Sequence, residues 1–178
     1  MQFQRKSTNA FGVNGRARAS FSQMGMWRRL ATTVARPPLQ RVGDVGREVR
    51  TFTEKDVAAF VQLTRDNNPL HDDEGFAASQ RFGGRVVHGM LYASMFSALI
   101  GQRSPGAVYV SQTLNFRRPV HLGDTVTAEV EVERVGRAGR VMDFATRCFN
   151  QRSELVLSGE ARVLMPARSN AAIQGAQQ

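Results

Sequence analysis

The segment from Gly89 to Ile100 is the part of this sequence that most restricts the folds open to the chain. It reads Gly-Met-Leu-Tyr-Ala-Ser-Met-Phe-Ser-Ala-Leu-Ile. Wound as a helix, it has apolar residues on every face, so the helix has to be buried nearly all round. Gly101 and Pro105 predict where this helix ends. The segment is too short to cross a bilayer, which takes about 20 apolar residues.

The residues after this segment predict a sheet that wraps the helix. From Val126 to Val132, apolar residues alternate with threonine and glutamate, a period of two that is typical of strands. Three further segments show the same alternation: Val108–Phe116, Met142–Cys148 and Leu155–Val163. The connections at Gly136–Gly139 and Asn150–Ser153 have hairpin length. Helices followed by an antiparallel run of strands predict an α+β domain.

The residues before the apolar segment predict shorter elements. A short strand is expected from Glu48 to Phe52. Thr53 has the features of a helix N-cap, and Asp56 approximates the acid of a capping box. Apolar residues then recur at helical spacing, so this helix is expected to deliver Asp66 just past its end. A further short helical turn is expected from Asp73 to Gln80.

The charge of the chain is concentrated at its beginning. Residues 1–41, here called the leader, contain arginines but no Asp or Glu, so they carry most of the net charge of +9. This composition is typical of a mitochondrial transit peptide with a linker at Pro37-Pro38. The alternative is a basic tail that binds nucleic acid. The expected organisation is leader 1–41, one domain at 42–167 and a disordered tail at 168–178.

The stretch from Asp66 to His71 is the first candidate site. It reads Asp-Asn-Asn-Pro-Leu-His, and its turn-forming residues and proline predict a shaped loop. Such a loop can aim a carboxylate and an imidazole into one pocket, as a general acid/base pair requires. The alternative is a plain turn with a surface histidine. Asn68 either holds this loop or the substrate through its amide, or is only a turn residue.

No metal or cofactor site is expected. Cys148 is the single cysteine, which leaves neither an intramolecular disulfide nor a cysteine-based metal site. The three histidines lack metal-binding spacing, and the sequence has no glycine-rich phosphate loop.

Two blocks carry a family resemblance. Asp-x-Asn-Pro-Leu-His at residues 66–71, followed by Val-His-Gly-Met-Leu at residues 87–91, resembles the MaoC-like (R)-specific enoyl-thioester hydratases and dehydratases. The resemblance covers about Val45 to Pro166. Within this family the chain is most similar to the mitochondrial 3-hydroxyacyl-thioester dehydratases of type II fatty acid synthesis. The family usually has glycine where Arg65 stands and proline where Glu74 stands.

The resemblance implies a hot-dog fold, in which a curved antiparallel sheet wraps the helix that begins near Gly89. It also implies a hydro-lyase that reversibly dehydrates (3R)-3-hydroxyacyl thioesters to trans-2-enoyl thioesters. The substrate is expected on acyl carrier protein or CoA, and no cofactor is needed because the reaction is redox-neutral. A homodimer in the mitochondrial matrix is expected, without nucleic acid or membrane partners.

The resemblance also implies roles for residues. Asp66 and His71 transfer the two protons, and which of them handles the carbon-bound proton stays open. The backbone N–H of Gly89, at a helix N-terminus, is the candidate oxyanion donor. Asn68, Ser97 and His88 are the candidate substrate-binding residues. The alternatives are a turn role for Asn68, a bond from Ser97 to the carbonyl one turn back, and an N-cap or structural role for His88.

Two other functions remain open at this point. One is an (R)-specific enoyl-CoA hydratase of fatty acid breakdown, and the other is a non-catalytic subunit that binds acyl thioesters. An acidic carrier predicts a basic docking surface, for which the sequence offers three arginine clusters. They are Arg81 with Arg85, Arg117 with Arg118, and the arginines of residues 134–140. The alternative for each cluster is an ordinary solvated surface.

Overall fold

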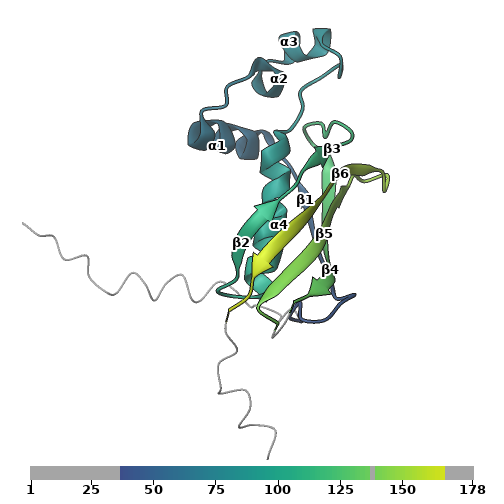
Figure 1. Cartoon of the computed structure of the whole chain (residues 1–178). Helices are drawn as coiled ribbons and strands as arrows, with labels where there is room; N and C mark the ends of the chain where they lie inside the picture. The colour runs from purple at the N-terminus through teal and green to yellow at the C-terminus, as the bar shows by residue number, and fades with distance from the viewer. Residues whose placement is uncertain (1–36, 137–138, 167–178) are drawn as a thin grey trace, which may run out of the picture. The chain divides into compact units, whose positions relative to one another are not determined.

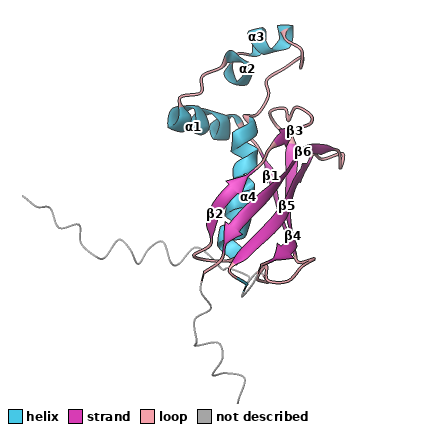
Figure 2. Cartoon of the chain, viewed as in Figure 1, coloured by secondary structure: helices cyan, strands magenta, loops and turns pink. Residues whose placement is uncertain are grey.

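The computed structural model describes residues 37–136 and 139–166. The predicted transit peptide up to residue 36 and the predicted tail at 168–178 lie outside the described residues. In the described part, one antiparallel sheet curves around the long helix α4 (Gly89–Arg103), as Figures 1 and 2 show. The α+β prediction is confirmed, with the helix-in-sheet arrangement that the resemblance implied. No helix among these residues is long and apolar enough to span a membrane.

The sheet has six strands, all paired antiparallel. Its main path runs β1-β4-β5-β6-β2, and β3 pairs separately with β6. The strands are β1 (Val45–Thr51), β2 (Val108–Gln112), β3 (Asn115–Phe116), β4 (Thr125–Val135), β5 (Val141–Phe149) and β6 (Leu155–Leu164). Because β1 pairs with β4, helices α1 to α4 are all inserted between two neighbouring strands.

The predicted alternation in β4 sets the face that packs on α4. Val126, Ala128, Val130 and Val132 are each at most 1% exposed. They belong to one apolar core with the buried residues of α4, which are Tyr92, Ala93, Met95, Phe96, Leu99 and Ile100. Complete burial of a large apolar side chain contributes roughly 1.5–3 kcal/mol. This helix–sheet contact is therefore the main source of stability.

Helix α4 differs from its prediction in two ways. It continues through Gly101 to Arg103 and is capped at Ser104, because tertiary packing outweighs the roughly 1 kcal/mol cost of an internal glycine. It is also not buried all round. One stripe, formed by Met90, Ser94, Ser97, Ala98 and Gly101, is exposed.

Strand β2 presents its valines outward. Val108 and Val110 are 58% and 61% exposed, while Tyr109 packs against the core. The prediction of a strand is confirmed, but its even-numbered valines do not form a buried face. The sequence of an edge strand does not reveal which of its side chains face the core. Either the odd-numbered or the even-numbered residues can pack inward.

The packed part of the chain begins before residue 42, the predicted boundary. Leu39 is 1% exposed and belongs to the core. The backbone N–H groups of Gln40 and Arg41 both donate to the Asp44 carboxylate at 2.8 Å. Residues 39–41 are thus integrated into the domain, and β1 begins at Val45 rather than at the predicted Glu48.

Three short helices lie between β1 and α4, and residues 54–79 are here called the excursion (Figure 1). They are α1 (Glu54–Thr64), α2 (Pro69–Asp72) and α3 (Glu74–Ser79). The capping box predicted at Thr53 and Asp56 is present, as is the short helix expected after Asp73. Within the three helices only Val57 and Ala77 are buried.

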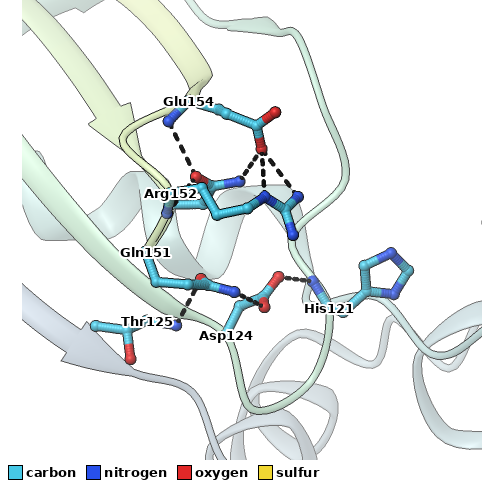
Figure 3. A network of polar contacts seen from close by, with 7 residues as sticks. His121, Asp124, Thr125, Gln151, Arg152 and Glu154 are labelled. Carbon is cyan, nitrogen blue, oxygen red and sulfur yellow. Dashed lines mark hydrogen bonds and ion pairs between the residues drawn. The ribbon is translucent and has the colours of Figure 1, made fainter.

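Polar contacts join the β5–β6 turn to the start of β4 (Figure 3). Gln151 accepts from the Thr125 N–H and donates to the Asp124 carboxylate, which also accepts from the His121 N–H. Within the turn, Glu154 accepts from Asn150 and Arg152. This network holds the residues just before β4 against the turn that joins β5 to β6.

Candidate active site

Asp66 is placed by the way α1 ends. The C-cap residue Arg65 is left-handed, with φ 61° and ψ 22°, and its N–H donates to the Val61 carbonyl. Glycine is the usual residue in this conformation because it has no Cβ. The glycine that the family usually has here therefore matches a backbone requirement, and Arg65 meets the same requirement with strain. The turn at Arg65 sends the chain from α1 directly into Asp66.

His71 lies on a helical turn rather than on the predicted loop. Asn68 caps α2 by accepting from the Leu70 N–H at 3.1 Å, and Pro69 occupies the first helical turn. Proline disfavours a helix only for the residue before it, while it suits the first helical position. The loop prediction is thus wrong for Pro69 to His71. For Asn68, the cap agrees with the interpretation as a structural turn residue.

The ring of His71 is oriented by a backbone carbonyl. Its Nδ1 lies 2.7 Å from the Val86 oxygen. Since a carbonyl only accepts, Nδ1 carries the hydrogen, and in the neutral form of the ring Nε2 keeps its lone pair. The half-buried His71 ring therefore presents a proton-accepting nitrogen.

His88 is the most buried polar residue near this pair, with 2% of its surface exposed. Its Nε2 lies 3.1 Å from the Asp66 backbone oxygen and 3.9 Å from Asp66 Oδ2. Its ring stacks on that of His71, with centroids 3.6 Å apart. Burial lowers the pKa of His88, and the neighbouring His71 adds to this effect. His88 makes no side-chain cap bond, so the predicted N-cap role is limited to its backbone position.

The structure thus brings three predicted residues together. One carboxylate oxygen of Asp66 and one ring nitrogen each of His71 and His88 lie within 4.8 Å of one another. Such a set resembles a metal site in composition. However, the hydrogen on His88 Nε2 is committed to the Asp66 carbonyl, so this nitrogen has no lone pair to offer. The arrangement suits proton transfer better than metal ligation.

Gly89 opens α4 beside a cavity of about 460 Å³, here called the Phe116 cavity. Within the described residues the Gly89 N–H donates to no acceptor. A Cβ on Gly89 would lie 2.5 Å from Phe116 Cε1, so glycine is what allows the Phe116 ring to pack this closely against the start of α4. The cavity is lined by His71 and Gly89, by apolar side chains that include Phe82 and Met90, and by Arg81, Arg117 and Arg118.

Two predicted residues lie apart from this cavity. Asp66 is not among its lining residues, and its side chain is 53% exposed. Ser97 lies on the exposed stripe of α4, roughly 12 Å along the axis from Gly89 at 1.5 Å per residue. Its hydroxyl donates to the Ser94 carbonyl at 3.1 Å. No contact between Ser97 and Asp66 occurs among the described residues, so a role for Ser97 stays a prediction.

Sequence reasoning missed two residues that are distant in the sequence from the motifs they contact. Phe116 faces Gly89 from β3, and its ring packs edge-on against Tyr92 at 6.0 Å. Val86 was missed because it acts through its carbonyl, which has no sequence signature. The paired Phe116-Arg117 at the end of an apolar alternation was visible, but nothing in the pattern linked it to Gly89.

Glu74 explains the second departure from the family pattern. It occupies the first position of α3, where the proline usual in the family is structurally favoured. Its carboxylate instead accepts from Arg85, which also pairs with Glu54 at the start of α1. These two contacts raise the pKa of the Arg85 guanidinium. Arg85 therefore ties α1 to α3 rather than projecting freely.

Comparisons with known proteins agree with this geometry. The MaoC like domain matches residues 38–148. The mitochondrial 3-hydroxyacyl-acyl-carrier-protein dehydratase of Arabidopsis thaliana is 43% identical over 141 residues, covering 78% of this chain and 85% of the relative. The (R)-specific enoyl-CoA hydratase of Aeromonas caviae is 46% identical over 127 residues, covering 70% and 95%.

The solved structures give the same result. The (R)-hydratase from A. caviae superposes with a TM-score of 0.69 at 44% identity, covering 71% of this chain and 97% of that one. The hot-dog prediction is confirmed by this likeness, and the relatives are named as dehydratases and hydratases, which are hydro-lyases. With its two motifs, its fold and these relatives in agreement, the chain belongs to the MaoC-like dehydratase family.

Proposed function

We propose that this protein catalyses the reversible dehydration of (3R)-3-hydroxyacyl thioesters to trans-2-enoyl thioesters in mitochondrial fatty acid synthesis. One observation carries the proposal: a carboxylate and an imidazole with a free Nε2 lie within 4.8 Å of each other. His71 shares the lining of the Phe116 cavity with Gly89, whose N–H has no acceptor among the described residues, and Asp66 contacts His88, the residue before Gly89. This set contains the acid, the base and the oxyanion donor that the reaction requires.

The chemistry needs two proton transfers that balance. In hydration, one group takes a proton from water as its oxygen bonds to C3, and the other gives a proton to C2. Dehydration reverses both steps and releases water. Asp66 and His71 supply the two groups, holding one transferable proton between them. A positioned acid or base typically contributes about 10²–10⁴-fold to the rate.

The negative charge that develops on the thioester oxygen needs a donor. The Gly89 N–H is suited to this role because it lies at the N-terminus of a 15-residue helix. Apolar side chains around the Phe116 cavity lower the polarity around this N–H and strengthen the interaction. His71, in the same cavity wall, then faces the carbon chain of the thioester held there.

The leader and the relatives support the mitochondrial matrix as the location. The acid-free leader is typical of a transit peptide, and two relatives, from Arabidopsis thaliana and Solanum lycopersicum, are named mitochondrial 3-hydroxyacyl-acyl-carrier-protein dehydratases. Acyl carrier protein is therefore the proposed carrier. The alternative is an (R)-specific enoyl-CoA hydratase, as the A. caviae relative is named.

Three arginines are placed to meet the carrier. Arg81, Arg117 and Arg118 line the Phe116 cavity, and none of them forms an ion pair within the described chain. Arg85 was grouped with Arg81 on sequence grounds, but Glu54 and Glu74 already neutralise it. The docking surface is therefore proposed to comprise Arg81, Arg117 and Arg118 without Arg85.

Charge reversal tests this surface. Arg81→Glu combined with Arg118→Glu is expected to raise KM for a carrier-bound crotonyl substrate at least tenfold more than for crotonyl-pantetheine. Arg140→Glu is the control, because Arg140 is exposed and its carbonyl accepts from Met165, near the opposite end of α4. Equal KM changes for both substrates would argue against carrier docking here. A wild-type preference for CoA over carrier protein would favour the alternative function.

A homodimer is also proposed, with the edge strand β2 at the interface between the two copies. Both β1 and β2 end the sheet, but β1 bears the charged residues Arg47, Glu48 and Arg50, which protect an edge from pairing. β2 reads Val-Tyr-Val-Ser-Gln, carries no charge and exposes two valines. An uncharged apolar edge favours an isologous contact with a second copy.

A matched pair of substitutions tests the dimer edge. Val110→Lys is expected to give a monomer by light scattering at micromolar concentration. Val49→Lys is the control, because Val49 is 60% exposed on the other edge strand, and it should leave a dimer. A dimer in both variants would exclude β2 as the interface. A monomeric parent would refute the homodimer.

The activity itself is tested on protein that begins at Pro37, which keeps Leu39 in the core. Crotonyl-CoA should be hydrated, and chiral analysis should find the (3R)-hydroxybutyryl thioester, since one fixed acid/base pair reaches one face of the chain. No turnover with either CoA or carrier-bound substrate would support a non-catalytic acyl-binding subunit. Mainly (3S) product would contradict the assigned reaction.

A further inference from the structure

We propose that His88 is the positioning residue of the acid/base pair, with its Nε2–H holding Asp66 and its ring holding the ring of His71. The inference rests on the proposed function and deepens it. His88 is almost completely buried, is absent from the lining of the Phe116 cavity, and contacts both Asp66 and His71. It therefore acts on the reaction through these two residues rather than by touching the substrate.

The first contact holds the backbone of Asp66. The His88 Nε2–H donates to the Asp66 carbonyl oxygen at 3.1 Å. The Asp66 side chain is 53% exposed, so packing does little to hold it. Its own N–H makes only a 3.3 Å bond to the Thr64 hydroxyl. Its carboxylate accepts from the N–H of Asn68, which like Thr64 is exposed, so within the described chain the bond from His88 is the one that ties Asp66 to the protein interior.

The second contact holds the ring of His71. The two imidazoles are stacked, with centroids 3.6 Å apart and planes 25° from parallel. The Val86 carbonyl fixes the edge of the His71 ring, while the His88 ring fixes its plane. Phe60 of α1 packs on His88 at 5.0 Å and supports it in turn. A reaction that loses about 10²-fold for a 1 Å misplacement depends on such supports.

The neutral state of His88 follows from its surroundings. Asp66 and Asp72 face it and favour its charged form, while burial and the adjacent His71 favour the neutral form and prevail. In the neutral tautomer Nδ1 bears no hydrogen, and it has no partner among the described residues. Protonation there would bury an unpaired N–H. Proton uptake on Nδ1 of His88 is therefore disfavoured, which keeps the ring in the tautomer that donates to Asp66.

Two substitutions separate the contacts. His88→Gln keeps an N–H donor for the Asp66 carbonyl but removes the ring, whereas His88→Phe keeps a stacking ring but removes the donor. Each is expected to lower kcat on crotonyl thioester by roughly 10–100-fold, with KM changed less than about threefold. A residue that only stabilised the fold would lower the amount of active protein without this separation of kcat from KM, once folded protein is quantified.

The controls keep the outcomes distinct. His121→Gln removes a histidine from a turn that is bonded through its backbone, and should retain kcat within about twofold. Retention of parental kcat by either His88 variant would overturn the positioning role. An inactive parent would instead refute the proposed function, and the ring state of His88 would then be decided by spectroscopy alone.

Nitrogen NMR of the unaltered protein supplies this second measurement. The His88 ring should show the Nε2–H neutral tautomer, and should keep it as the pH falls through 6.5, the ordinary histidine value. Protonation of His88 at or above that value, or an Nδ1–H tautomer, would overturn the inference. This result does not depend on whether any variant folds.

Discussion

The core and the excursion are held together by different forces. In the core, large side chains such as Phe96, Phe144 and Leu157 are at most 1% exposed. In the excursion, polar contacts replace burial. They are the capping box of Thr53 and Asp56, the caps of Asn68 and Asp73, and the bridge from Arg85 to Glu54 and Glu74. The excursion nevertheless carries both members of the proposed acid/base pair.

This difference indicates that stability and activity are largely separable in this protein. Apolar burial in the core sets most of the free energy of unfolding. In the excursion each hydrogen bond contributes only about 0.5–1.5 kcal/mol net, yet it fixes where a reacting group lies. Substitutions in the excursion should therefore alter the reaction, and substitutions in the core should alter the stability.

The largest effect is expected for the acid/base pair itself. Asp66→Asn and His71→Gln should each lower kcat by about 10²–10⁴-fold, because each removes one proton transfer. Both side chains lie outside the core, so the free energy of unfolding should change by less than about 1 kcal/mol. Steady-state kinetics and thermal unfolding measure the two quantities. Near-parental turnover in either variant would remove that residue from the reaction.

The second effect belongs to the core. Protein that begins at Val42 lacks Leu39 and should be less stable than protein that begins at Pro37 by about 2–4 kcal/mol, by analogy with deletion of a buried leucine. Leu39→Ala in the longer protein is the control that isolates this side chain. Denaturant unfolding gives the comparison. Equal stability of the two proteins would show that residues before Val42 do not contribute to the core.

A smaller effect is expected where the excursion is tied together. Arg85→Gln should destabilise the protein by only about 0.5–1.5 kcal/mol, since its carboxylate partners are mostly exposed. The loss should be local: amide hydrogen exchange should accelerate in α1 and α3 but not in β4 and β5. Arg152→Gln, which breaks a similar pair beside β6, should leave exchange in α1 and α3 unchanged. Uniform acceleration would mean that the excursion does not open independently.

The smallest effect is a gain. Arg65→Gly should stabilise the protein by about 0.5–1 kcal/mol, because glycine adopts the left-handed conformation without Cβ strain. Ser153, with φ 59° in the β5–β6 turn, offers the matched substitution in the other region. Ser153→Gly should gain a similar amount. Loss of stability in both variants would show that the flexibility of glycine in the unfolded chain outweighs the strain that it relieves.

Sequence reasoning predicted the core well because periodicity reports burial directly. The alternation from Val126 to Val132 gave the buried face of β4 residue by residue. The prediction was wrong at β2, where both faces of the strand carry side chains that can pack against the core. It was also wrong at Gly101, where tertiary packing continues helix α4 past a glycine. These errors arise where tertiary contacts, rather than local preference, decide the outcome.

The candidate site was predictable only in part. Asp66, His71 and Gly89 were found because two spaced motifs name them, and the helical spacing of the apolar residues correctly placed Asp66 after α1. The stacking of His88 on His71 and the position of Phe116 over Gly89 were not predicted. They depend on how separate elements meet, which no local pattern records.

The pairing of β1 with β4 also has a bearing on the order of folding. Arg47 and Glu129 are paired across it, 82 residues apart in the chain. Strands β4, β5 and β6 are joined by short turns and close at little entropic cost, whereas β1 must close the long loop that contains every candidate site residue. We therefore expect pulse-labelled amides in β5 to become protected during refolding before those in β1. A chain stopped at that stage would possess most of its sheet and no means of acting on a thioester.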